Sequence, residues 1–246
     1  MHNIHLKISG MLMVLSSMLF AAPPSAQQDL HEVEKIRNYY QIKGYFETDI
    51  ESNYYAGVTE VKPYLKQNVK LVYSKDAVYY GVNEVEVFAM HNAMVQVNKP
   101  SHEIYVQQWT PDADRNPYSF SWMDSLLKSK KLTLKVTDLQ NGKAMMVMYS
   151  SATTNTYKIW YEKATGKIEQ LEMQMPTQFS SQNGKPIQYS RMQLIYRNAV
   201  KHEGTFPFSR YDSKKYVNVN GKKASLTASS KGYKLNDYLN LNVNSK

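Results

Sequence analysis

The amino-acid sequence predicts a mainly β fold of the α+β kind. We expect a strongly curved antiparallel sheet, or incomplete β-barrel, of about 11 strands with two helices against its concave face. The stretch Val69–Trp109 holds short apolar runs, rich in Val and Tyr, that turn residues separate without room for a helix. Similar runs resume at Leu132. Only two segments, 29–40 and 121–131, have apolar residues at helical spacing.

The N-terminal residues 1–26 have the pattern of a secretory signal. Lys7 is the only Lys, Arg, Asp or Glu before Asp29, and an apolar run follows over Met11–Ala22. That run is shorter than the roughly 20 apolar residues that a membrane-spanning helix needs. We therefore predict export and one domain over 27–246, with an uncleaved membrane anchor as the alternative. An exported chain without cysteine suits a bacterial periplasm, where it is expected to be soluble.

The first helix is predicted over Asp29–Tyr40, where Asp29 and Glu32 have the spacing of a capping box. A strand with one polar side follows at Phe46–Tyr54, because acidic and apolar residues alternate there. The next strand is predicted over Tyr64–Ser74, and the meander continues from it.

The second helix, 121–131, carries an apolar stripe of Trp122, Leu126 and Leu127. We predict that this stripe forms a lid over the sheet. Strands then resume, and the pairs Asn141–Gly142 and Asn220–Gly221 indicate tight hairpins, because Asn and Gly tolerate positive φ.

No pattern in the sequence indicates catalysis. There is no GxSxG, HExxH, P-loop, GxGxxG or cysteine pair. Asp112 begins a segment like a calcium loop, but Pro117 and Met123 stand where such a loop needs Gly and Glu. We predict a protein that is not an enzyme and binds neither metal nor cofactor.

Methionines are frequent in the predicted strands, and Met adapts to variable apolar shapes. A curved sheet that presents them on its inner face would hold an acyl chain. The alternative is that they fill a core under the helices. The predicted cavity lining consists of Phe88, Met90, Met94, Val97, Met146, Met148, Trp160, Met173, Met192 and Leu194.

The formal net charge of +9 indicates an anionic partner. The secretory signal makes nucleic acid an unsuitable partner, so an anionic membrane surface fits better. The candidate headgroup-facing patch is Lys214, Lys215, Lys222 and Lys223. The alternative is a solvated edge whose lysines block edge-to-edge strand pairing.

The order of elements also resembles a known family. The segments YFETDIES, EVFAMHNAMVQVNKPSHEIYV and YKIWYEKATGKIEQLEMQM, and above all W-x-E-x-x-T-G-x-I at Trp160–Ile168, are similar to the periplasmic lipoprotein carriers of the LolA/LolB type, in particular their divergent Bacteroidetes members. The resemblance implies an incomplete antiparallel barrel whose helical lid encloses acyl chains in an apolar cavity.

The predicted function is that of an exported, monomeric periplasmic carrier for a lipid or lipoprotein acyl chain. The alternative is a structural or interaction module of the envelope, with a filled core and no lipid ligand. The two differ in whether the concave face of the sheet is open.

Overall fold

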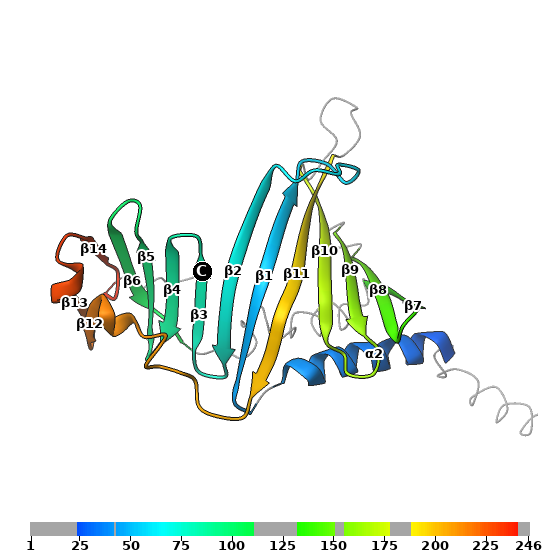
Figure 1. The fold of residues 1–246 in the computed structure, drawn as a ribbon, viewed down its shortest axis with the longest axis horizontal. Helices are drawn as coiled ribbons and strands as arrows, with labels where there is room; N and C mark the ends of the chain where they lie inside the picture. Colours follow the sequence, from blue (N-terminus) through cyan, green and yellow to red (C-terminus); the bar gives the residue numbers. More distant parts are fainter. Residues whose placement is uncertain (1–23, 42, 111–131, 151–154, 178–187, 241–246) are drawn as a thin grey trace, which may run out of the picture.

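The computed structural model describes residues 24–41, 43–110, 132–150, 155–177 and 188–240. Figure 1 shows a broad curved sheet with one long helix at one end of its strands. The elements, in order, are α2 (Pro24–Tyr40), β1 (Tyr45–Tyr55), β2 (Leu65–Ser74), β3 (Val78–Val82), β4 (Val85–Met90), β5 (Ala93–Asn98), β6 (Glu103–Gln108), β7 (Leu132–Asp138), β8 (Lys143–Ser150), β9 (Thr156–Glu162), β10 (Ile168–Pro176), β11 (Tyr189–His202), β12 (Val217–Asn220), β13 (Lys223–Leu226) and β14 (Lys234–Asp237), with 3₁₀ turns η2 (Ser213–Lys215) and η3 (Ala228–Ser230).

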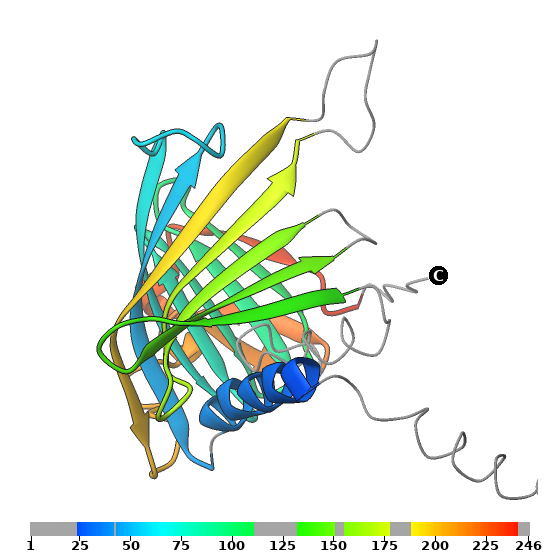
Figure 2. The same ribbon diagram turned by 90° about the vertical axis from the view of Figure 1, so that its right-hand side faces the viewer.

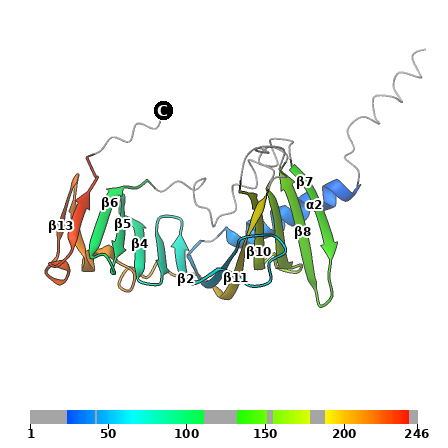
Figure 3. The same cartoon turned by 90° about the horizontal axis from the view of Figure 1, so that it is seen from above.

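Twelve of the described strands form one open sheet in the order β14-β6-β5-β4-β3-β2-β1-β11-β10-β9-β8-β7. Its neighbouring strands are antiparallel except for β14, which runs parallel to β6. The two edge strands, β14 and β7, stand apart at opposite ends of the arc, so the sheet is curved but not closed (Figure 3). The predicted curved, open antiparallel sheet is confirmed; β12 and β13 form a separate hairpin.

Tight turns set the strand boundaries in the meander. His91 and Asn92 both have positive φ between β4 and β5, and Met90 pairs with Ala93 across that turn. Asn141 and Gly142 likewise have φ of 60° and 71° between β7 and β8. These are the angles that a type I′ turn needs, so the hairpin predicted there is confirmed.

Helix α2 covers part of the concave face and differs from the prediction in extent. It begins at Pro24, so Asp29 lies inside the helix and does not cap it. The described residues contain this single α-helix, not two. The second predicted helix, 121–131, lies outside the described residues, as does the part of the predicted signal before Pro24.

Apolar residues on both faces of the sheet give two separate cores. On the concave face, Val33, Ile36 and Tyr40 of α2 pack against strands β1, β2 and β8–β10. On the convex face, residues 203–240, which we call the C-terminal segment, lie across β3–β6 and contribute Phe206, Tyr211, Val217 and Leu239 to the second core. The arm β3–β6 is therefore covered from outside, whereas α2 covers the other half of the sheet from inside (Figures 1 and 3).

The predicted lining residues of the meander do not all lie on the same face of the sheet. Phe88, Met90 and Val97 lie in the convex core, with exposed fractions of at most 2%. Met94 pairs with Ala89 and therefore points to the concave face. Side chains along a strand alternate between the two faces of the sheet. Because β4 has apolar residues on both of its faces, their hydrophobicity alone does not show which of them face the concave side.

Candidate functional site

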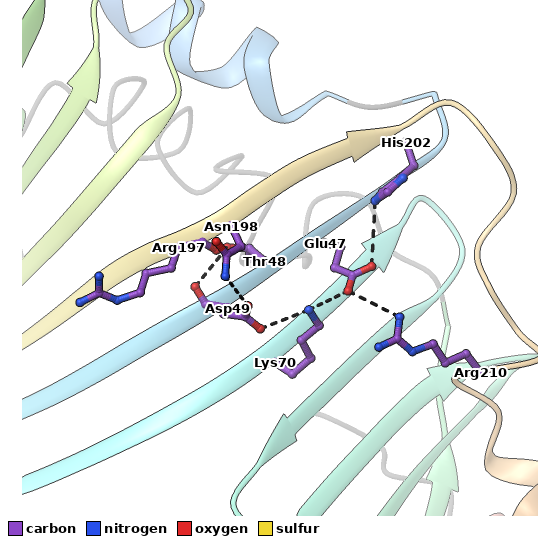
Figure 4. Close-up of polar contacts among 8 residues, drawn as sticks. All are labelled: Glu47, Thr48, Asp49, Lys70, Arg197, Asn198, His202 and Arg210. Atoms are coloured by element: carbon purple, nitrogen blue, oxygen red, sulfur yellow. Dashed lines mark hydrogen bonds and ion pairs between the residues drawn. The ribbon is translucent and has the colours of Figure 1, made fainter.

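The two faces of the central strands differ in chemistry. In β1, Phe46, Thr48 and Ile50 are buried on the concave face, whereas Glu47 and Asp49 point to the convex face. Figure 4 shows that Lys70 of β2 lies between these two carboxylates, at 2.6 Å from Glu47 and 3.1 Å from Asp49.

Further polar contacts extend this convex band. Arg210 lies 3.9 Å from Glu47, and Asn198 donates a hydrogen bond to Asp49 (Figure 4). Hydrogen bonds from Asn53, Lys66 and Arg197 hold the pKa of Glu51 at about 2. The centre of the convex face thus carries a band of ion pairs and hydrogen bonds, which makes it unsuited to an apolar ligand. The concave face is the candidate site.

Helix α2 is fixed to one end of the concave face by three kinds of contact. The Tyr161 hydroxyl donates a 2.9 Å hydrogen bond to the buried carboxylate of Glu32. The backbone N–H of Ile168 donates to the Tyr40 hydroxyl at 3.0 Å. Gly166 lies so close to α2 that a Cβ there would be 2.6 Å from the carbonyl oxygen of Lys35. Burial and the Glu32 carboxylate both raise the pKa of Tyr161, so its hydroxyl stays protonated and donates.

An apolar row of side chains crosses the concave face at the opposite end of the strands from α2. Consecutive register pairs link seven strands, from β7 through β8, β9, β10, β11 and β1 to β2. We call it the methionine–tyrosine row: Leu134, Met148, Tyr157, Met173, Met192, Tyr54 and Leu65. No member carries a charge. Figures 1 and 2 show how far these strand ends extend from α2.

Burial changes along this row. Met148 is fully buried in the concave core, and Met173 and Met192 are half-buried. Leu65, at the β2 end, is 42% exposed. The row therefore runs from the core to an accessible apolar end, where β1 and β2 are joined by residues 56–64.

The loop 56–64 continues this apolar surface to the rim of the sheet. Val61 and Tyr64 are 92% and 70% exposed, the two highest values among the large apolar side chains of the described residues. The loop is held in place, since Arg191 donates to the carbonyl of Glu60 at 2.6 Å and the N–H of Tyr64 donates to the carbonyl of Tyr54.

The structure brings together only some of the predicted lining residues. Met146 and Met148 are fully buried in the concave core. Met173 and Met192 belong to the methionine–tyrosine row, and Leu194 lies beside it in the adjoining row. Trp160 pairs with Met145, on the convex face, and so points away from these residues. Phe88, Met90, Met94 and Val97 lie on the arm, apart from them.

Of the predicted lid and basic patch, only the basic patch lies within the described residues. Trp122, Leu126 and Leu127 lie outside the described residues. Lys214, Lys215, Lys222 and Lys223 are exposed on the C-terminal segment. Lys215 lies 3.3 Å from Glu86 and helps to fasten that segment to the arm, so part of the cationic patch is already neutralised within the protein.

The predicted lining included neither the tyrosines of the row nor the exposed loop at its end. Tyr157 lies between Thr156 and Lys158, and Tyr54 shares its side of the predicted strand with Phe46 and Ile50, a signal that could have added both tyrosines to the predicted lining. Within the described residues, no group of three or more His, Asp or Glu side chains could hold a metal ion. No helix in the described part is long and apolar enough to cross a membrane.

Fold and site define an open, curved antiparallel sheet whose concave face is covered at one end by a helix and is apolar at the other. No family model matches the sequence. No curated protein matches it either.

Several solved structures resemble the fold. A conserved protein of Thermus thermophilus is 10% identical, with a TM-score of 0.42 over 78% of this chain and 94% of that one. A LolA superfamily protein of Nitrosomonas europaea is 6% identical, with a TM-score of 0.35 over 76% and 98%. An outer membrane lipoprotein-sorting domain of Vibrio parahaemolyticus is 9% identical, with a TM-score of 0.35 over 77% and 98%.

The similar structures thus include proteins of the family that the sequence resembles. Because all three TM-scores lie below 0.5 and the identities reach only 10%, this likeness says nothing about a ligand. The function is therefore inferred from the side chains of this chain.

Proposed function

We propose that this protein binds an acyl chain of a lipid or lipoprotein along the concave face and carries it within the bacterial envelope. The observation that supports the proposal is the methionine–tyrosine row. It crosses seven strands without a charged residue and ends at the exposed Leu65.

The chemistry of the row suits a flexible hydrocarbon. Methionine side chains adapt to variable shapes, and tyrosine rings offer apolar faces beside a polar hydroxyl. Each buried CH₂ group contributes about 0.8 kcal/mol to binding. A chain segment of about ten CH₂ groups therefore gains ~8 kcal/mol before the cost of ordering, which is enough for useful affinity.

The loop 56–64 supplies a route between this surface and a membrane. Val61 and Tyr64 project from the rim beside Leu65, and Lys62 stands among them. Aromatic and aliphatic side chains mixed with lysine favour the interface of an anionic bilayer. We assign the protein to the periplasm, in keeping with the export signal predicted for residues 1–26.

A fluorescent fatty acid tests the proposal. The purified wild-type protein should bind it saturably, and native mass spectrometry should show co-purifying lipid. Met192→Glu places a charge in the middle of the row and should weaken binding at least about tenfold, because a carboxylate loses hydration when an acyl chain covers it.

Thr133→Glu is the matched control, since Thr133 is exposed on β7 and pairs with Tyr149 on the other face of the sheet. Equal binding by both variants would contradict the proposed site. A wild-type protein that binds no fatty acid and carries no lipid, but captures a reproducible envelope protein, would favour the structural module instead.

A further inference from the structure

A pocket lies on the concave face of the arm, and its lining differs in chemistry from the methionine–tyrosine row. Its volume is about 210 Å³, and it is lined by Met94, Gln96, Tyr105, Gln107 and Tyr238. The lining residues of β5 and β6 alternate with Val95, Val97, Ile104 and Val106 of the convex core, so they point to the concave side. The lining has no charged side chain.

Two tyrosine rings form one wall of this pocket. The rings of Tyr105 and Tyr238 are nearly parallel, with centroids 6.5 Å apart and planes 15° apart. The Tyr105 hydroxyl donates a 2.8 Å hydrogen bond to Glu103, which fixes the direction of its ring. The carboxylate of Glu103 is in turn paired with Lys234 at 3.5 Å.

Strand β14 positions the second ring. It runs parallel to β6, and the N–H of Tyr238 donates to the carbonyl of Val106 at 2.7 Å. The next residue, Leu239, is buried in the convex core. Tyr238 is therefore held on the concave side while it remains 41% exposed, so its ring is both ordered and accessible.

Two side-chain amides face the same pocket. Among the described residues, the amide of Gln96 has no hydrogen-bonding partner, and that of Gln107 contacts only the thioether of Met94, at 3.8 Å. Each amide offers both donors and an acceptor. The described lining thus combines amides with spare hydrogen-bonding capacity and ordered aromatic faces, and it lacks charge. It matches a ligand that is neutral, rich in hydroxyls and apolar on one face.

We propose that this pocket binds a neutral sugar ring. Vicinal hydroxyls both donate and accept, as the Gln96 and Gln107 amides do, and the C–H face of the ring packs on tyrosine. The volume of about 210 Å³ is below the roughly 300–1,000 Å³ of clefts that take drug-sized ligands, so the proposed ligand is a single ring and not a longer saccharide. This site does not depend on the proposed acyl-chain site, because it is formed by β5, β6 and Tyr238.

Ligand-observed NMR with four methyl glycosides, those of glucose, galactose, mannose and N-acetylglucosamine, tests the site. At least one should bind the wild-type protein saturably, with a dissociation constant on the order of 1–10 mM. Tyr238→Ala and Gln96→Ala should each weaken that binding about tenfold or more. Tyr149→Ala removes a comparably exposed tyrosine, 42%, from the other face and should leave binding unchanged.

Two results would overturn the inference. One is that none of the four glycosides binds saturably. The other is that Tyr238→Ala and Gln96→Ala bind as well as wild type, with thermal unfolding showing that all variants are folded. Fatty-acid binding should be unaffected by Tyr238→Ala, so failure of the sugar site is distinguishable from failure of the acyl-chain site.

Discussion

The hydroxyl of Tyr161 on β9 donates a hydrogen bond to the carboxylate of Glu32 on α2, at 2.9 Å and across 129 residues of sequence. Both side chains are buried, with exposed fractions of 0% and 4%. Lys35 also lies 2.8 Å from Glu32, so the carboxylate is both paired and hydrogen-bonded. This contact joins the helix to the strands that it covers.

Tyr161→Phe should therefore destabilise the protein. The substitution keeps the ring but leaves a buried carboxylate with one donor fewer, which costs about 1–3 kcal/mol. Urea unfolding should show a lower midpoint with an unchanged slope. Tyr149→Phe, at an exposed tyrosine, is the control and should unfold like wild type. An unchanged midpoint for Tyr161→Phe would show that the hydrogen bond does not stabilise α2.

The second prediction distinguishes two causes of destabilisation by a glycine-to-alanine substitution: a steric clash of the new Cβ with α2, and the cost of a positive φ. Gly166 and Gly142 both have positive φ, of 81° and 71°. A Cβ at Gly166 would be 2.6 Å from the Lys35 carbonyl oxygen, whereas at Gly142 nothing lies within 4 Å. Both alanine variants incur the left-handed backbone cost of about 1 kcal/mol, but only Gly166→Ala also displaces α2.

Thermal unfolding should therefore show that Gly166→Ala has a lower free energy of unfolding than Gly142→Ala, by more than about 1 kcal/mol. Hydrogen exchange should additionally show faster exchange in α2 for Gly166→Ala alone. Equal losses of stability in the two variants would mean that the backbone conformation accounts for the whole effect and that the helix is not packed tightly against this turn.

The third prediction concerns pH. Hydrogen bonds from Asn53 and Lys66 lower the pKa of Glu51 from its ordinary 4.5 to about 2. A carboxyl with a lowered pKa in the folded state stabilises the protein above its unfolded pKa, and this contribution is lost as the pH falls through the folded pKa. The Glu51 carboxylate thus contributes fully to folding stability above pH 4.5, and this contribution is lost as the pH falls from 4.5 to about 2.

Glu51→Gln should reduce stability near neutral pH and change it progressively less toward pH of about 2, where the wild-type carboxyl is protonated as well. Urea midpoints measured across this range check the expectation. Glu84→Gln, at an exposed turn carboxylate, provides the comparison. A difference between Glu51→Gln and wild type that stays constant down to the lowest pH would contradict a lowered pKa at this position.

The sequence predicted the strands well because their boundaries are local. Asn141–Gly142 adopts the positive φ angles that its residue types favour. The faces were harder to predict. Phe88 is buried in the core that the C-terminal segment completes, and its ring centroid lies 6.1 Å from that of Tyr216, a residue more than a hundred positions away in the sequence. Strand β4 is apolar on both sides, so periodicity gave no signal.

The candidate site depends even more on long-range register. Met173 and Met192 were predicted as lining residues, but Tyr54 and Leu65 join them only through the pairing of β11 with β1 and of β1 with β2. Tyr238 reaches Tyr105 only because β14 returns as a parallel edge strand. No local pattern near Lys234–Asp237 indicates that partner.

The last prediction tests which surface meets a membrane. Val61 is 92% exposed at the tip of the loop 56–64, and burying a valine in an apolar environment contributes about 1.5 kcal/mol. Val61→Asp should therefore reduce co-flotation with vesicles of phosphatidylethanolamine and phosphatidylglycerol about tenfold. Val219→Asp is the matched control, because Val219 is exposed on the β12–β13 hairpin beside Lys222 and Lys223. If the protein instead docks through that basic hairpin, Val219→Asp will reduce flotation and Val61→Asp will not, which would reject the rim loop as the membrane contact.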